Sequence, residues 1–322
     1  MAAVRTILRI LAALGLAVDA GIHAKLAGQY DAVSAANRSP GRLRQASTST
    51  TAWAARRPWG LYLALLLVAL LVIAVIAPQL LTSGLPFESH YADALQPPSF
   101  AHWFGTDESG RDLYTRVVYG ARESLVIGLG AAAVGILTAL VLGSLAALGP
   151  KPVAVVVDRF VEVMFSFPAL LLALLLIAIT GPSATTEVLA VGLGTAPGYA
   201  RMIRGQILAA KGAPYVEAAR ALGHPRSRIV VAHILPNALR PLIAVFALSV
   251  GQSIVWASSL SFLGLGVAPP ASEWGALLDA GRANIIQAPW LVVIPGLVIV
   301  AVALAATTIG RHLQSWLEKG EK

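Results

Sequence analysis

The residue types that most often do chemistry show no catalytic pattern in this sequence. The chain has no cysteine, and it lacks both the Gly-x-x-x-x-Gly-Lys-Ser/Thr phosphate loop and the Gly-x-Ser-x-Gly turn of hydrolases. Six histidines show no His-Glu-x-x-His or other tight metal-binding spacing: His23, His90, His102, His224, His233 and His312. We therefore expect no catalytic residue, no metal site and no cofactor bound by this chain, and an ATPase or hydrolase built from it alone is disfavoured.

A polar segment over residues 205–237 has the pattern of two short helices joined by a tight turn. Pro214 suits a first helical turn, where its missing N–H is no loss, and Gly223 suits the left-handed position after a helix. A second helix can begin at Pro225 and should stop or kink near Pro236. This segment is the best candidate for a docking element.

The first of these two helices has side chains that suit contact with another protein. Ala218 and Ala219 leave one side of the helix nearly bare, so a partner could approach its backbone closely. Glu217 lies in the first turn, where the helix dipole favours a negative charge and where a basic residue of a partner could pair with it. Periodicity alone fits an ordinary amphipathic connector as well, because Ala, Glu and Arg are common helix formers.

A second polar pattern lies within the apolar run 242–263. Five residues recur there at three-to-four spacing: Ser249, Gln252, Ser253, Trp256 and Ser259. This spacing places them roughly on one face of a helix. Polar groups in hydrocarbon face either protein or a water-filled path. A translocation path and interhelical hydrogen bonds of about 0.6 kcal/mol per pair are both open interpretations.

The composition indicates that lipid surrounds the elements that position these residues. Of 322 residues, 57% are hydrophobic and 12% are charged, against about 45–50% and about 25% in soluble domains. A soluble chain of this length could not hide so much apolar surface from water, and disordered chains are charge-rich. We therefore interpret the net charge of +8 as an excess of Lys and Arg in the loops on one side of the membrane.

Six apolar runs, each near the ~20 residues that cross ~30 Å of hydrocarbon, predict an all-α membrane protein with six transmembrane helices. They are residues 61–77, 125–148, 163–179, 188–203, 242–263 and 289–309. If the chain before the first run is cytoplasmic, 20 of the 24 Lys and Arg residues lie on the inner side. The positive-inside bias thus predicts that both termini are cytoplasmic.

Residues 1–57 form a predicted N-terminal extension to the membrane domain of residues 58–322. The apolar run 7–18 is too short to span a membrane, and residues 34–57 are a Ser/Thr/Arg-rich stretch without acidic residues. We favour an amphipathic helix lying on the inner leaflet followed by a cytoplasmic linker. A seventh span with the N-terminus outside is the alternative.

The sequence resembles a known family of membrane proteins. Glu217-Ala218-Ala219, Gly223 and Leu235-Pro236 resemble the EAA loop of ABC-importer permeases, the coupling helix that docks into a nucleotide-binding subunit. Further motifs, in matching order over about residues 58–310, resemble the C-type subunit of the dipeptide/oligopeptide/nickel permeases. These motifs are Gly105-Thr-Asp-Glu-Ser-Gly-Arg-Asp112, Tyr119-Gly-Ala-Arg122, Ser166-Phe-Pro168, Pro197-Gly-Tyr-Ala-Arg201, Arg204-Gly-Gln206, Ser259-Leu-Ser-Phe-Leu-Gly-Leu-Gly266 and Trp274-Gly275.

Three features depart from that family. The extension of residues 1–57 is longer than the short N-terminus of relatives, and the end of the chain from Gly310 lacks their acidic pattern. Ala257 stands where many relatives have a glutamate just before the Ser-Leu-Ser-Phe-Leu-Gly run. The loss of that charge weakens any transfer of substrate identity from relatives.

The resemblance implies the type I ABC-importer permease fold in a cell membrane. It implies a B-type permease partner, two ATPase subunits that use ATP and Mg, and an extracytoplasmic substrate-binding protein, with no nucleic-acid partner. It assigns ATPase coupling to a set of loop residues: Tyr215, Glu217, Ala218, Ala219, Gly223, Leu235, Pro236 and Asn237. Di- or oligopeptides are the expected cargo. Nickel or another small solute is the closest rival, and a channel or secondary transporter without ATPase partners is less favoured.

The resemblance also places residues 105–112 near the outer mouth of the path. Asp107, Arg111 and Asp112 could there contact the binding protein or brace the two permease subunits. They could equally pair with one another in a self-contained cap.

Overall fold

The structure, a computed structural model, describes residues 59–319, and it contains no strand within that range. The chain divides into Met1–Arg57 and Pro58–Lys322. The predicted amphipathic helix and linker of residues 1–57 lie outside the described residues. The all-helical architecture expected for the remainder is confirmed.

Four described helices are long and apolar enough to cross a membrane. They are α2 (Trp59–Ile76), α3 (Leu113–Leu148), α10 (Leu242–Phe262) and α12 (Trp290–Lys319). A fifth span exists if the bent pair α4 (Lys151–Ser166) and α5 (Ala169–Thr180) crosses as one unit. Helix α6 (Ala184–Lys211) is long enough but less apolar, so hydropathy and length do not establish the predicted sixth span.

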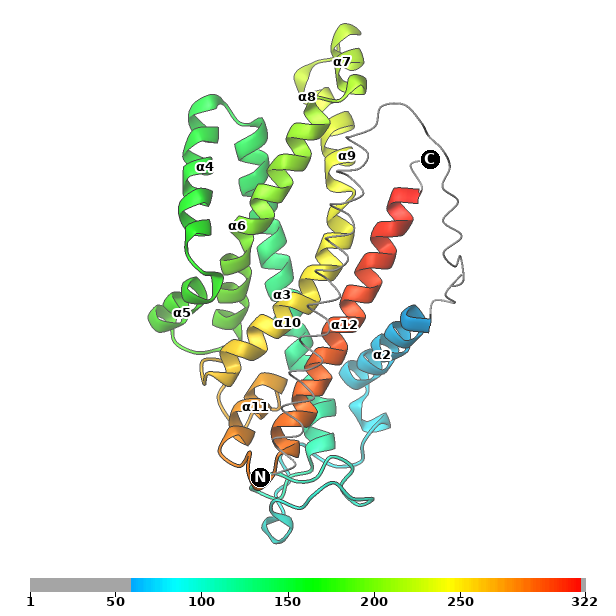
Figure 1. Ribbon diagram of the computed structural model, residues 1–322, viewed down its shortest axis with the longest axis vertical. Helices are drawn as coiled ribbons and strands as arrows, with labels where there is room; N and C mark the ends of the chain where they lie inside the picture. The colour runs from blue at the N-terminus through cyan, green and yellow to red at the C-terminus, as the bar shows by residue number, and fades with distance from the viewer. Residues whose placement is uncertain (1–58, 320–322) are drawn as a thin grey trace, which may run out of the picture. The chain divides into compact units, whose positions relative to one another are not determined.

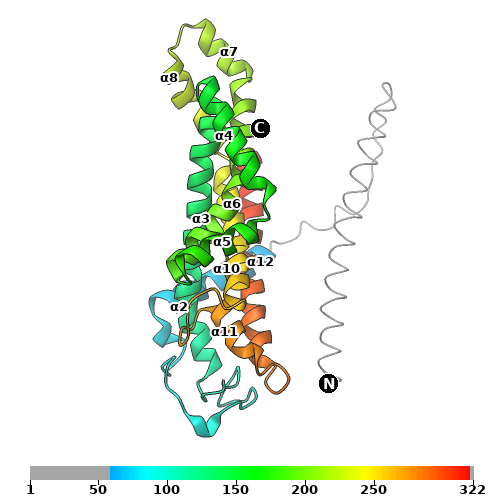
Figure 2. The ribbon, with the colours of Figure 1, turned by 90° about the vertical axis from the view of Figure 1, so that its left-hand side faces the viewer.

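The long helices α3, α6, α10 and α12 run beside one another, and α2 lies against α3 and α12 (Figure 1). The short helices α7 (Pro214–Ala221) and α8 (Arg226–Ile229) form one end of this bundle. The opposite end contains α11 (Trp274–Arg282) and the irregular segment 77–112 (Figure 2). The two polar segments singled out from the sequence are thus at opposite ends.

Helix α3 begins at Leu113, which is 12 residues before the start of the predicted apolar run 125–148. Asp112 caps it, because its Oδ1 accepts a hydrogen bond from the Thr115 N–H at 2.8 Å. The 36 residues of α3 correspond to about 54 Å at 1.5 Å per residue. The helix is therefore longer than the hydrocarbon layer and reaches the irregular segment 77–112.

The predicted run 163–179 is not one helix. It breaks at Phe167 and Pro168, where α4 and α5 meet at 93°. Proline removes a backbone donor and pushes the residue before it to extended dihedrals, which Phe167 adopts (φ −87°, ψ 136°). This break opens a cavity described below.

Close packing of α3 against α6 depends on glycine. A Cβ atom on Gly192 would lie 2.8 Å from Val134 Cβ and 2.9 Å from the Ala131 carbonyl oxygen. A Cβ atom on Gly194, which begins a Gly-x-x-x-Gly pattern, would instead lie 3.0 Å from the Ala169 carbonyl oxygen of α5. Gly192 therefore sets the distance between the two longest helices of the first half of the bundle.

We expect Gly192→Val to destabilise the protein by about 1–3 kcal/mol through overpacking. Gly205→Val on the same helix is the matched control, because a Cβ there meets nothing within 4 Å. Thermal unfolding of the two purified variants in the same detergent should show a lower midpoint for Gly192→Val only. Equal midpoints would show that the α3–α6 contact tolerates a wider spacing.

Candidate functional site

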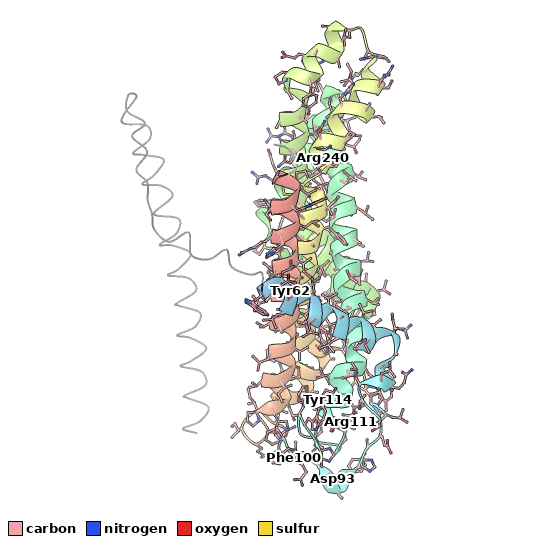
Figure 3. All side chains as sticks on the ribbon, turned by 90° about the vertical axis from the view of Figure 1, so that its right-hand side faces the viewer. Tyr62, Asp93, Phe100, Arg111, Tyr114 and Arg240 are labelled. Atoms are coloured by element: carbon pink, nitrogen blue, oxygen red, sulfur yellow. The ribbon has the colours of Figure 1, made fainter. Side chains whose placement is uncertain are left out.

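The segment expected to dock another protein forms a separate lobe at one end of the bundle. We call residues 212–239 the coupling lobe; it consists of α7, α8, a π-helical turn η3 (Val230–Ile234) and α9 (Leu235–Leu239). Arg226 ties the lobe to the end of α3, because its Nη2 donates to the Leu148 carbonyl at 3.1 Å. Arg240 follows directly after the lobe (Figure 3).

Gly223 ends α7 in the predicted left-handed conformation, with φ of +74°. The His224 N–H donates to the Ala219 carbonyl at 3.2 Å, and the Gly223 N–H donates to the Arg220 carbonyl at 2.9 Å. This bonding pattern is the Schellman motif, which reverses the chain after a helix. A Cβ at Gly223 would meet nothing within 4 Å, so the space beside the turn is open.

The two alanines of α7 do not lie on the same side, contrary to the sequence interpretation. Ala219 is buried together with Val216 in an apolar cluster at the base of the lobe, whereas Ala218 is exposed. Successive helical residues are about 100° apart, so Ala219 is turned toward the cluster while Ala218 is turned away from it. Glu217 is exposed beside Ala218.

Leu222 was not identified from the sequence as a contact residue, yet it is 77% exposed. Tyr215, Ala218 and Leu222 follow the i, i+3, i+7 spacing of one helical face, and all three are exposed. This spacing is the sequence signal by which Leu222 could have been identified. We call Tyr215, Glu217, Ala218 and Leu222 the docking face.

The second arm of the lobe does not stop at Pro236. The five-residue π-helical turn directly before α9 widens the helix, and the chain continues through the proline. Leu235 packs in the apolar cluster of the lobe, while Pro236 and Asn237 are exposed. The Asn237 amide donates to the His233 carbonyl at 2.7 Å. These three residues belong to the base of the lobe.

The five candidate path residues of α10 do not share one face. Ser249 and Ser253 are buried, and the Ser249 hydroxyl donates within its own helix to the Phe246 carbonyl at 2.8 Å. Gln252 and Ser259 are exposed and Trp256 is half-buried. This division favours internal packing for the two serines and leaves Gln252, Trp256 and Ser259 as the open side of the helix.

Gln252 and Trp256 line a cavity of about 530 Å³ at the break between α4 and α5. We call it the bend cavity. Its other large side chains come from α4, the break and α6: Met164, Phe165, Phe167, Tyr199 and Met202. The Tyr199 hydroxyl donates to Gln252 Oε1 at 3.0 Å, which joins α6 to α10 across the cavity.

At the opposite end of the bundle, Asp107 organises the segment 77–112. Its Oδ1 accepts the backbone N–H groups of Ser109 and Arg111 at 2.9 and 3.0 Å. Its Oδ2 accepts Arg111 Nε and Arg116 Nη1, both at 2.7 Å. Asp107 and Arg116 are 2% and 3% exposed, so these charges are partnered inside the cap. Figure 3 labels Arg111 and Tyr114 at this end of the bundle.

Asp112 differs from Asp107 and Arg111 because it borders open space. It lines a second cavity, of about 350 Å³, at this end of the bundle, where its Oδ2 lies 3.0 Å from His102 Nδ1. Of the three candidate outer-mouth residues, Asp112 is therefore the one that lines this cavity.

Two buried carboxylates also join distant helices and were missed from the sequence. Glu273 caps α11 by accepting the N–H groups of Gly275 and Ala276, both at 2.8 Å, and it also accepts the Ser124 hydroxyl at 3.2 Å. Glu187 Oε1 accepts the Ser261 hydroxyl at 3.1 Å. Both residues are at most 1% exposed. Within residues 59–319, no three His, Asp or Glu side chains are grouped to hold a metal ion.

Comparison with known proteins places this architecture in a family. Residues 139–319 match the family described as binding-protein-dependent transport system inner membrane component. The chain belongs to this family. The predicted family membership is thus confirmed, and the chain is a multi-pass permease subunit, the non-catalytic membrane component of an ABC transporter.

Curated relatives of this permease carry peptide names. It is 38% identical to the dipeptide transport system permease protein DppC of Alkalihalophilus pseudofirmus, over 79% of this chain and 83% of that protein. It is 38% identical to the glutathione transport system permease protein GsiD of Pectobacterium atrosepticum, over 69% and 73%. It is 36% identical to the probable D,D-dipeptide transport system permease protein DdpC of Escherichia coli, over 79% and 85%.

The fold of the permease also matches a solved structure. The crystal structure of an amino acid ABC transporter with histidines aligns over 63% of this chain and 94% of that chain, with a TM-score of 0.53 and 19% identity. This likeness establishes the importer-permease fold alone. It carries no information on the cargo of the present chain.

Proposed function

We propose that this permease forms one half of the translocation path of an ATP-driven importer for di- or oligopeptides. The observation that carries the proposal is the coupling lobe, which presents an exposed helical face and an open glycine turn at one end of the bundle. A protruding helix with an unoccupied face suits docking into a groove of a second protein. The chain has no phosphate loop, so its energy must come from such a partner.

The complete transporter then contains a B-type permease, two ATPase subunits that use ATP and Mg, and an extracytoplasmic binding protein. Glu217 on the docking face supplies a charge that a basic residue of an ATPase can pair with. At the opposite end, Asp112 and the cavity that it lines offer a contact for the binding protein. The two ends therefore serve different partners.

We further propose six spans with both termini in the cytoplasm. Helix α6 is the sixth span, because it packs along α3 within the bundle despite its lower hydropathy. The coupling lobe contains or adjoins Lys211, Arg220, Arg226 and Arg228, and the positive-inside bias assigns such a segment to the cytoplasm. Residues 77–112 then face outward in a cell membrane.

Peptides are preferred as cargo over nickel because the relatives' names include dipeptide, glutathione and D,D-dipeptide. The bend cavity supports this choice, since no histidine or carboxylate lines it, and a path for a bare metal cation favours such ligands.

Uptake by membrane vesicles that contain the permease with its co-expressed partner subunits tests the proposal. With ATP inside and binding protein outside, we expect accumulation of a labelled dipeptide such as Ala-Phe and none of nickel. Vesicles without ATP are the control. Accumulation that is independent of ATP would support a channel or secondary transporter, and ATP-dependent nickel uptake without peptide uptake would reverse the cargo assignment.

A further inference from the structure

The bend cavity combines apolar walls with an absence of charge. Its volume of about 530 Å³ falls in the range of about 300–1,000 Å³ that is typical of small-ligand sites. No Lys, Arg, Asp, Glu or His side chain lines it. A charged group that entered this cavity would lose hydration without a charged side chain in the lining to pair with it, which is costly. Arg201, whose guanidinium lies 4.6 Å from the ring centre of Phe165, is not part of the lining. An uncharged group is the favoured occupant.

Methionine is concentrated in this cavity. The chain has three methionines, and Met164 and Met202 both lie in the cavity wall. Methionine side chains are flexible and polarisable, and proteins that bind varied ligands use them as adaptable surfaces. Phe165, Phe167 and Trp256 add rigid aromatic walls. This mixture suits apolar and aromatic side chains of several sizes.

Gln252 adds a polar group of defined orientation. Because Tyr199 donates its hydroxyl to Gln252 Oε1 at 3.0 Å, the amide oxygen is used as an acceptor and the two N–H groups on Nε2 remain as donors. Donors suit a carbonyl oxygen and repel a cation. When the cavity is covered, these donors require acceptors, and a peptide backbone supplies them.

We infer that the bend cavity is a subsite that receives an uncharged apolar or aromatic side chain of the transported peptide, while Gln252 donates to a peptide carbonyl. The inference rests on the proposed function and specifies its cargo: this subunit selects peptides by side-chain apolarity. Charged ends of the same peptide are bound elsewhere in the transporter.

A charge placed in the cavity wall provides the sharpest test. In vesicles with the full complex, we compare ATP-driven uptake of Ala-Phe and Ala-Glu by the wild type and by Met202→Lys. We expect the ratio of Ala-Glu to Ala-Phe uptake to rise by about tenfold, within the range that one specificity contact provides. Leu208→Lys, on the same helix and 40% exposed outside the cavity, is the control and should leave the ratio unchanged.

A labelling experiment on the wild-type complex covers the case in which Met202→Lys fails to assemble. A dipeptide that carries benzoylphenylalanine is irradiated with the complex during turnover, and the adducts are mapped by mass spectrometry. We expect adducts within residues 164–168, 199–202 or 252–256. Adducts confined to other segments would overturn the inference.

Two further outcomes are decisive and can be told apart. If both dipeptides are taken up and Met202→Lys leaves their ratio unchanged, the cavity does not select side chains and the inference is wrong. If Met202→Lys and Trp256→Ala instead release the second permease subunit during purification, with an unchanged ratio, the cavity is a subunit contact and the inference is again wrong. No uptake of either dipeptide by the wild type would refute the proposed function itself.

Discussion

Replacing Gly223 by valine is expected to reduce ATP-driven uptake to background while the protein still inserts into the membrane. The residue has φ of +74°, a conformation that costs L-residues about 1–2 kcal/mol and that β-branched side chains avoid. Valine would move the turn out of this conformation and displace α7, whose docking face includes Glu217. It would also fill the open space beside the turn.

The control for this prediction is Gly223→Asn. Asparagine adopts the left-handed conformation more readily than other non-glycine residues, so it should keep the turn and retain more uptake than valine. Glu217→Lys tests the charge of the docking face without altering the backbone and should also abolish uptake. Membrane yield and co-purification with the ATPase distinguish lost docking from lost insertion. Normal uptake by Gly223→Val and Glu217→Lys would refute the docking assignment.

Asp107→Ala is expected to destabilise the permease by about 3–5 kcal/mol at the end that contains α11, the cost of leaving a buried charge unpaired. The carboxylate accepts four hydrogen bonds, including those of Arg111 and Arg116. Its loss leaves the guanidinium of Arg116, which is 3% exposed, without its carboxylate. The folded yield and the thermal midpoint in detergent should both fall sharply.

Glu108→Ala is the matched control in the same turn. Glu108 also pairs with Arg111, at 3.3 Å, but its side chain is 43% exposed, and exposed pairs contribute about 0–1 kcal/mol. A midpoint for Asp107→Ala equal to that of Glu108→Ala would show that the buried cluster contributes little to stability. A fall in binding-protein affinity at an unchanged midpoint would instead move Asp107 to a docking role.

The membrane class and the turn of the coupling lobe could be predicted because each depends on local sequence. The composition alone indicated that lipid surrounds most of the chain. The left-handed conformation of Gly223 depends on residues within one helical turn of it. The start of α3 could not be predicted from hydropathy, because residues before 125 include Arg116 and Ser124. Their partners, Ala271 and Glu273, are about 150 residues away in the chain.

The separation of the five candidate path residues on α10 into buried and open groups also depends on contacts with other helices. At about 100° per residue, the five residues from Ser249 to Ser259 cover an arc of about 120° on the helix. Spacing shows that they lie on this arc, but the edge of the core runs through it and separates Ser249 and Ser253 from the rest. Glu187 was missed similarly, because Ser261, its partner, lies on another helix.

The continuity of α6 determines where the permease can bend. It runs without interruption from Ala184 to Lys211 and passes through Pro197, whereas α4 and α5 are broken at Pro168. Under the proposed function, this helix of 28 residues, about 42 Å long, would carry a displacement of the coupling lobe to the far end of the bundle. Gly181 and Gly212 flank this helix, so substitutions that stiffen those two glycines should slow the transport cycle rather than block binding.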